Sequence, residues 1–221
     1  MLEKVYQETY KKLILEVDAL DNGVSCADDM LYSVKTGLGS RVGRYNTNWN
    51  APKSTSQHEQ FKKAMKVCEE EFLWALKGTV MVKLPAYGIV KKAFEDRKNF
   101  HPSGEIMQME GGACPWKEHL LDLEADSGCK GEVKFLVTQD ARKMWRVVTV
   151  PPKPNSFEQR VPICRAWRGL RGTELQKVSG IADTEFVHMA CFTGGAWSKA
   201  SAVKMCELSI KEFKESEGAK E

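Results

Sequence analysis

Phe186-Val-His-Met189 and Phe192-Thr-Gly-Gly195, two short runs near the end of the chain, decide the fold of its C-terminal half. Upstream of them lie Trp167-Arg-Gly-Leu-Arg-Gly172 and Val178-Ser-Gly-Ile181. Together these runs predict a short helix, a buried strand, a glycine loop and a closing helix. Glycines in a loop let the backbone approach a phosphate, and a helix N-terminus presents unpaired N–H groups to it. We therefore expect the glycine pair to form a phosphate-binding loop.

Five residues of this stretch are candidate substrate ligands. Gly194 and Gly195 would form the loop, and Arg168 and Arg171 lie upstream on a predicted loop. His188 lies in an apolar strand, where a lone histidine is more often a hydrogen-bonded core residue than a ligand. We therefore keep both interpretations of His188 open.

The rest of the chain alternates helical and extended patterns, which predicts a mixed α/β protein. A helical N-terminal part is expected up to about residue 100, followed by a mixed α/β part with a hairpin around the polar turn Gln139–Lys143. Helices are predicted over residues 2–20, 38–44, 61–76, 173–179 and 198–214, with a further helix from Pro85; strands are predicted over 105–109, 133–138, 144–150 and 185–189.

Composition bounds the class of protein. The chain has 221 residues, 42% of them hydrophobic, and a net charge of only +3, so any nucleic-acid-binding surface must be a local basic patch. Seven scattered cysteines without a C-x-x-C pair indicate reduced thiols in an intracellular compartment. No apolar run approaches the length of a membrane span.

Two pairs of charged residues in the helical part have open interpretations. Asp18 and Asp21 lie three apart at a predicted helix end, where acids are usually solvated but could also bind a metal. Arg41 and Arg44 share a helical face, which is either solvated surface or a phosphate contact.

Cys114-Pro-Trp-Lys-Glu-His119 is the most unusual run. A zinc site would need a second pair of ligands, which the sequence does not offer. The Pro-Trp pair is typical of a structural anchor. Lys117 and His119 would then either face a substrate groove or belong to ordinary packing and surface.

The sequence resembles the melanocyte-proliferating-gene exonuclease family, a branch of the DHH phosphoesterases. The resemblance covers nearly the whole chain, and the matching runs follow one another in family order. They are Val17-Asp-Ala-Leu-Asp-Asn-Gly23, Ser40-Arg-Val-Gly-Arg44, Asn48-Trp-Asn50, Pro102-Ser-Gly-Glu105, Cys114-Pro-Trp-Lys-Glu-His-Leu120, Trp167-Arg-Gly-Leu-Arg171, and the three runs Val178–Ile181, Phe186–His188 and Phe192–Gly195. The Thr-His-Asn-Gly and Asp-His-His segments of the family do not occur in this chain.

The resemblance implies the C-terminal portion of a manganese-dependent 3′–5′ exoribonuclease. Residues 1–100 would complete a DHH-type domain, and residues 101–221 would form the DHH-associated domain that positions the 3′ end of single-stranded RNA. Asp21, and less directly Asp18, would be metal ligands, but the residues that complete the site would lie outside this chain. Many relatives have His or Asn after the glycine pair, whereas this chain has Ala196-Trp197, an aromatic that could stack on a base.

Two other functions are compatible with the sequence. One is a truncated or degenerate relative that binds RNA or protein without cleaving it, and the other is a hydrolase of a different phosphoester. Family resemblance implies the nucleus, the mitochondrion or both, and the cytoplasm stays open as a further intracellular location. We also expect the helical part to need the family's N-terminal region or self-association, because its apolar faces would otherwise be exposed.

Overall fold

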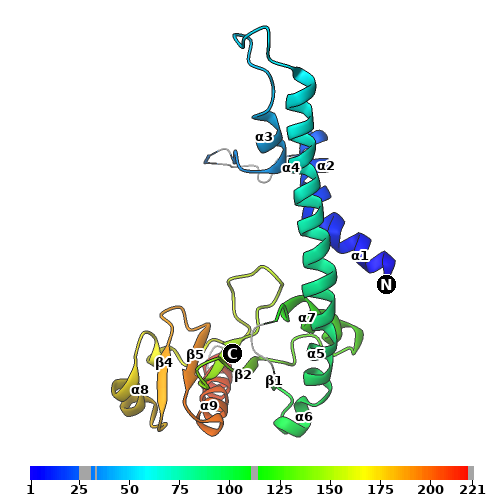
Figure 1. Ribbon diagram of the computed structural model, residues 1–221. Helices are drawn as coiled ribbons and strands as arrows, with labels where there is room; N and C mark the ends of the chain where they lie inside the picture. The colour runs from blue at the N-terminus through cyan, green and yellow to red at the C-terminus, as the bar shows by residue number, and fades with distance from the viewer. Residues whose placement is uncertain (25–30, 33, 111–113, 219–221) are drawn as a thin grey trace. The chain divides into compact units, whose positions relative to one another are not determined.

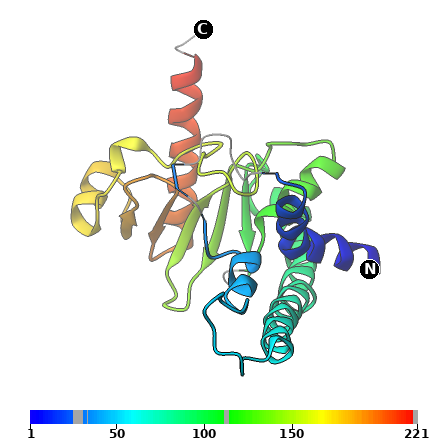
Figure 2. The ribbon, with the colours of Figure 1, turned by 90° about the horizontal axis from the view of Figure 1, so that it is seen from above.

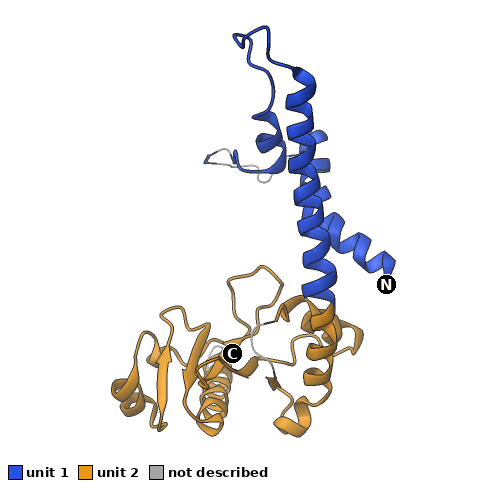
Figure 3. Cartoon of the chain, viewed as in Figure 1, with its two compact units in different colours: residues 1–84 blue, residues 85–221 orange. Residues whose placement is uncertain are grey.

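The computed structural model describes residues 1–24, 31–32, 34–110 and 114–218. The chain divides into two compact units, Met1–Leu84 and Pro85–Glu221 (Figure 1 and Figure 3). The mixed α/β class is confirmed. The assignment of residues 1–100 to a catalytic domain and of 101–221 to a substrate-binding domain stays a prediction.

Unit 1 is helical. It contains α1 (Leu2–Thr9), the π-helical turn η1 (Tyr10–Ile14), α2 (Leu15–Asp21), α3 (Leu38–Gly43), α4 (Gln57–Lys77) and the π-helical turn η2 (Gly78–Lys83). Ser56 begins α4 by accepting a hydrogen bond from the backbone N–H of Glu59, as expected of an N-cap residue. The turn η2 directly precedes α5 and Pro85, and a proline disturbs regular helical hydrogen bonding because it has no N–H.

Unit 1 buries little apolar surface. Among the described residues of this unit, the buried ones are small: Thr9, Ala64, Ala75 and Thr79. Large apolar side chains on its helices and connections are exposed, among them Trp49, Phe61, Met65, Phe72, Trp74 and Met81. The exposure of apolar faces expected from the sequence is therefore present in this unit.

Unit 2 is built on a mixed five-stranded sheet with strand order β1-β2-β3-β5-β4. Only β1 and β2 pair in parallel. The strands are β1 (Ile106–Met109), β2 (Phe135–Gln139), β3 (Trp145–Thr149), β4 (Thr184–Val187) and β5 (Thr193–Ala196). The helices are α5 (Leu84–Glu95), α6 (Arg97–Phe100), α7 (Lys117–Asp126), the 3₁₀ turn η3 (Arg165–Trp167), α8 (Gly172–Ser179) and α9 (Lys199–Gly218).

Both faces of the sheet carry apolar cores, because alternate strand residues point to opposite faces. One core joins Phe135 and Val147 to α8 and α9, and α9 lies beside the strands in Figure 2. The other joins Met107 and Leu136 to α5 and α7. The α5 and α7 core includes residues of β1 and β2 but none of β5 or β4. The α5 and α7 core therefore does not cover the β5–β4 end of its face of the sheet.

One predicted element was wrong. Gly194 and Gly195 do not form a loop: they lie in β5, buried between β3 and β4. The reversal of the chain occurs earlier, between Val187 and Thr193, where Cys191 adopts a left-handed conformation with φ 55°. The predicted hairpin, the strand near residues 105–109 and the last helix are confirmed.

Candidate nucleic-acid interface

A small pocket lies at the β3–β5–β4 end of the sheet in unit 2. Its volume is about 230 Å³, and it is lined by Arg142, Met144, Arg146, Arg171, Glu185, Phe186 and Trp197. Three arginines and two aromatic side chains therefore meet around one hollow.

Gly195 provides the room for this pocket. In the sheet it pairs with Arg146 of β3 on one side and with Phe186 of β4 on the other. A Cβ atom on Gly195 would lie 3.1 Å from Phe186 Cε1 and 3.1 Å from the Trp145 carbonyl oxygen. The missing side chain thus lets the Phe186 ring lie against β5, which a larger residue would prevent.

Two guanidinium groups lie over the Phe186 ring. Their Cζ atoms are 4.8 Å from the ring centroid for Arg146 and 5.8 Å for Arg171. A backbone bridge between Arg171 and Phe186 fixes the second arginine beside the strand. At these distances cation–π attraction stabilises the two guanidinium groups over the face of the Phe186 ring.

The positive charge is only partly neutralised. Arg146 Nε donates to Asp140 Oδ2 at 3.2 Å, and Arg142 lies 3.7 Å from the same carboxylate. Although partial burial opposes ionisation, hydrogen bonds from the backbone N–H groups of Met144 and Arg142 and from Arg146 lower the pKa of Asp140. Among the described residues Arg171 has no carboxylate within 4.0 Å, so its charge is available to a ligand.

Trp197 closes one side of the pocket. Its indole Nε1 donates to Glu185 Oε2 at 2.9 Å, and the side chain is half exposed. Aromatic faces stack on nucleobases, and guanidinium groups hold phosphates. The pocket can therefore bind an anion beside a flat ring.

The predicted substrate ligands do not all meet at this pocket. Arg171 lines it, and Gly195 lies next to Phe186, which lines it, whereas Gly194 faces the opposite side of β5, toward Met205 and Ile163 of the α9 core. His188 and Arg168 are exposed and belong to the other end of β4. His188 Nδ1 accepts the backbone N–H of Ala190 at 3.1 Å, so this histidine is a turn residue and not a buried core residue.

The Cys114–His119 run anchors α7 through Trp116, which is buried in the α5 and α7 core. Lys117 begins α7 and is exposed. His119 is only 1% exposed and meets Tyr87 edge-on, with ring centroids 5.6 Å apart. The two side chains therefore do not share a surface groove in this structure.

The charged candidates of unit 1 are held in local contacts. Asp18 accepts a hydrogen bond from the Tyr10 hydroxyl at 2.7 Å, and Asp21 is the last residue of α2. Arg41 pairs with Glu71 at 2.7 Å, and Arg44 donates to the Lys35 carbonyl oxygen at 3.4 Å.

Manganese does not fit the described residues as a complete site. Asp18 and Asp21 offer two carboxylates, whereas hard divalent cations take about six ligands. Within the described ranges no group of three or more His, Cys, Asp or Glu side chains could hold a metal ion. We therefore assign no metal-dependent step to these side chains.

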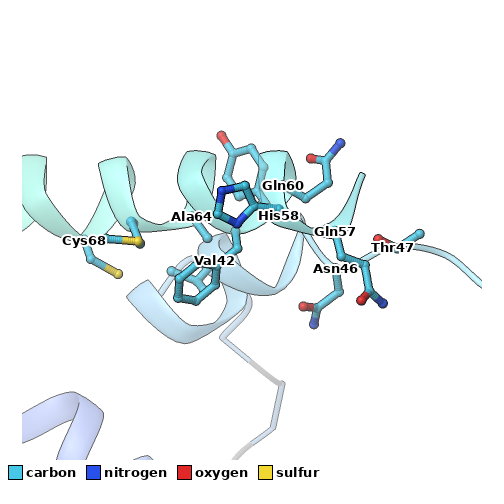
Figure 4. A pocket seen from close by; sticks show the side chains of 11 residues that line it. Val42, Asn46, Thr47, Gln57, His58, Gln60, Ala64 and Cys68 are labelled. Carbon is cyan, nitrogen blue, oxygen red and sulfur yellow. The ribbon is translucent and has the colours of Figure 1, made fainter. Parts of the chain in front are cut away.

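A second hollow lies within unit 1, between α3 and α4 (Figure 4). It has a volume of about 820 Å³ and mixes amide and apolar side chains. The lining includes Val42, Asn46, Gln57, Gln60, Phe61, Ala64 and Met65. Arg41 and Arg44, the candidate phosphate contacts of this part of the chain, do not line this hollow.

Arg142, Arg146 and Phe186 were not predicted from the sequence as binding residues, yet they line the pocket. One signal was present: Arg146 interrupts an apolar strand, Met144–Val150, at a position whose neighbours alternate inward and outward. A charged residue there must reach an open part of the sheet face. Trp197 was noted as a stacking residue, and it does line the pocket.

The chain matches known proteins along almost its full length. The model of a family described as "Uncharacterised protein family (UPF0160)", MYG1_exonuc, matches residues 1–210. The chain is 39% identical over 212 residues to the MYG1 exonuclease of Bos taurus and 38% identical to that of Homo sapiens; it is 30% identical to the MYG1 protein YER156C of Saccharomyces cerevisiae. Each alignment covers 95% of this chain but only 55%, 56% and 64% of the respective relative. No solved structure matches.

Proposed function

Because the chain belongs to the MYG1 family (UPF0160), we propose that it is the substrate-binding portion of a nuclease. The observation that carries this proposal is the pocket in which Arg146 and Arg171 flank Phe186 beside Trp197. The two mammalian relatives are named exonucleases. The pocket supplies a place where a nucleotide could be held.

In this proposal Arg171 binds a phosphate of the strand, and Trp197 and Phe186 provide faces for a base. A pocket of about 230 Å³ suits one terminal nucleotide unit more than a duplex. The finer properties rest on the family resemblance alone: single-stranded RNA as substrate, 3′–5′ direction, DHH-type chemistry and manganese dependence.

A non-catalytic binding module is the second proposal. The same pocket would then bind RNA without cleavage, since the described residues contain no cluster that could hold a metal ion. Hydrolysis of another phosphoester is the third proposal, because a guanidinium group binds any phosphate. Substrate competition separates them: a short oligonucleotide should bind more tightly than a mononucleotide only in the first two.

The exposed apolar residues of unit 1 support a further part of the proposal. Large hydrophobic side chains such as Phe61, Trp74 and Met81 are exposed, and contiguous exposed apolar surface marks an interaction site. The curated relatives are nearly twice as long as the matched region. We propose that this surface packs against the further polypeptide of such a protein, or against a second copy.

The pocket is tested by binding. Fluorescence anisotropy with a labelled single-stranded RNA should show a decrease in affinity of about tenfold for Arg171→Ala, because one charge-assisted contact is lost. Phe186→Leu should weaken binding by a similar factor through lost stacking. The matched control is Arg165→Ala, an exposed arginine on η3 that does not line the pocket.

The salt dependence adds a second readout. Arg171→Ala should reduce the slope of log affinity against log salt by about one, and Phe186→Leu should leave the slope unchanged. Equal losses in Arg171→Ala and Arg165→Ala would mean that the pocket is not the binding site.

A further inference from the structure

A second basic cleft lies in unit 2, at the opposite end of the β2–β3 hairpin from Arg142. It is formed by α7, the segment before β2 and the segment after β3, and its volume is about 570 Å³. Its charged lining residues are Asp122, Glu124, Lys130, Lys134, Lys153 and Arg160. The nuclease proposal makes no use of these residues.

A buried ion pair forms one wall of this cleft. Arg160 donates from both terminal nitrogens to Glu124, at 2.8 and 2.6 Å, and the two side chains are 9% and 1% exposed. Glu124 also accepts the backbone N–H groups of Val133 and Gly131. The carboxylate is therefore neutralised and fully bonded, and it does not compete with a bound anion.

The three lysines of the cleft form no close ion pair with a described residue, although the charges of Glu105 and Glu124 act on Lys134 from farther away. Lys130, Lys134 and Lys153 have no carboxylate within 4.0 Å among the described residues. Lys134 is partly buried and donates to the carbonyl oxygen of Gly131. Burial, and then the charge of Arg160, lower the pKa of Lys134. An ammonium group in such surroundings is stabilised by an added anion.

The remaining carboxylate of the lining is Asp122, which is exposed on α7. With Glu124 and Arg160 neutralising each other, the lining has three cationic side chains against one anionic one. No aromatic side chain lines the cleft, so it offers no stacking face for a base.

We propose that this cleft is a phosphate-binding site, in which Lys130, Lys134 and Lys153 hold the oxygens of the phosphate group. The site recognises the phosphate and makes no contact with a base. Either a free phosphorylated ligand or a strand that extends from the pocket carries this group; the chemistry of the contact is the same. Inorganic tripolyphosphate has neither base nor ribose, so it probes phosphate recognition without base stacking.

The experiment is isothermal titration of the whole chain with inorganic tripolyphosphate. The double variant Lys130→Gln/Lys153→Gln should bind at least about tenfold more weakly, because two charge-assisted contacts are lost. The control double variant Lys177→Gln/Lys211→Gln removes the same charge from exposed positions on α8 and α9 and should bind as wild type does. Equal weakening in both double variants would overturn the proposal.

A gain of affinity provides a test that misfolding cannot imitate. Asp122→Asn should tighten tripolyphosphate binding several-fold, because it removes the repelling carboxylate. Asp126→Asn, one turn later on α7 and outside the lining, should leave it unchanged. No measurable binding by wild type, or no difference between these two variants, would overturn the site.

The source of the phosphate follows from the same proteins. If a strand supplies the phosphate, the lysine double variant should also weaken single-stranded RNA binding and lower its salt slope by about two. If a free ligand supplies it, RNA binding stays unchanged while tripolyphosphate binding falls. Both results support the site.

Discussion

Replacing each glycine of β5 by alanine should separate stability from binding. The two residues are neighbours, but a Cβ atom would point to opposite faces of the sheet. At Gly194 it would lie 2.9 Å from the Phe186 carbonyl oxygen and 3.0 Å from Met205 Cε, on the α9 side. At Gly195 it would meet the edge of the Phe186 ring at 3.1 Å, inside the pocket.

The expected stability changes depend on whether the atoms next to the added Cβ can move. The carbonyl oxygen near Gly194 belongs to the backbone of β4 and cannot move without disturbing the sheet. Overpacking of this kind costs about 1–3 kcal/mol, and the lower entropy of the unfolded alanine chain offsets about 0.4–1 kcal/mol of it. We expect Gly194→Ala to lower the free energy of unfolding by about 1–2 kcal/mol, with RNA affinity nearly intact.

Gly195→Ala should have the reverse profile. The Phe186 ring can tilt away into the hollow, and the Trp145 carbonyl oxygen, at 3.1 Å, is less closely approached than the Phe186 carbonyl oxygen at 2.9 Å from Gly194. The stability loss should therefore be smaller than for Gly194→Ala. The tilted ring would occupy pocket volume and leave Arg146 and Arg171 without their common support. We expect RNA affinity to fall by about tenfold, comparable to the loss of one stacking contact.

The assay is a thermal melt and an RNA anisotropy titration on the same sample of each variant. Two results would refute the reasoning. If Gly195→Ala binds RNA as tightly as wild type, the Phe186 platform is not part of the binding site. If Gly194→Ala loses affinity at full folding, the glycines act together as a phosphate cradle despite lying in a strand.

Two further predictions concern pH and self-association. The hydrogen bond from Arg97, at 2.6 Å, lowers the pKa of Glu132 below its ordinary value of 4.5. The ionised Glu132 should therefore stabilise the folded protein above about pH 4.5, and this contribution should be lost as the pH falls further. Glu132→Gln should flatten this part of a profile of melting temperature against pH. Light scattering on a sizing column should show the isolated chain as a self-associated species because unit 1 exposes its apolar faces. A monodisperse monomer with a cooperative melt would contradict the second prediction.

Periodicity located most of the elements of unit 2. The alternation in Val133–Thr138 and Met144–Val150, with a polar turn between them, predicts a hairpin, and β2 and β3 pair in that way. These strands are flanked by apolar cores on both sides, so their sequence reports their surroundings directly.

The glycine pair shows what periodicity cannot report. Gly194 and Gly195 have no side chains, so their sequence contains no alternation, and turn chemistry favours a loop. What makes them a strand is their partners, Val147 and Arg146 on one side and Val187 and Phe186 on the other. A short window of sequence does not show which distant segments pair with it in a sheet.

The pocket could not be predicted for the same reason: its residues come from segments that are distant in the sequence. Arg142 and Arg146 lie on the hairpin, whereas Phe186 and Trp197 lie on β4 and just beyond β5. The strand order places β5 between β3 and β4, and only this order brings the two groups together. The family resemblance pointed to Arg171, which lines the pocket, and to Gly195, which lies next to Phe186, but also to His188 and Arg168, which do not line the pocket.

The ion pair between Glu124 and Arg160 has a consequence for the order in which the protein can mature. The two residues are separated by 36 positions, so a ribosome exposes the acid well before its partner. A buried carboxylate without its cation is strongly destabilising. We therefore expect α7 to pack stably onto the sheet only after the hairpin and the segment up to Arg160 have emerged. Until then the apolar side of α7 is available to chaperones and to neighbouring nascent chains.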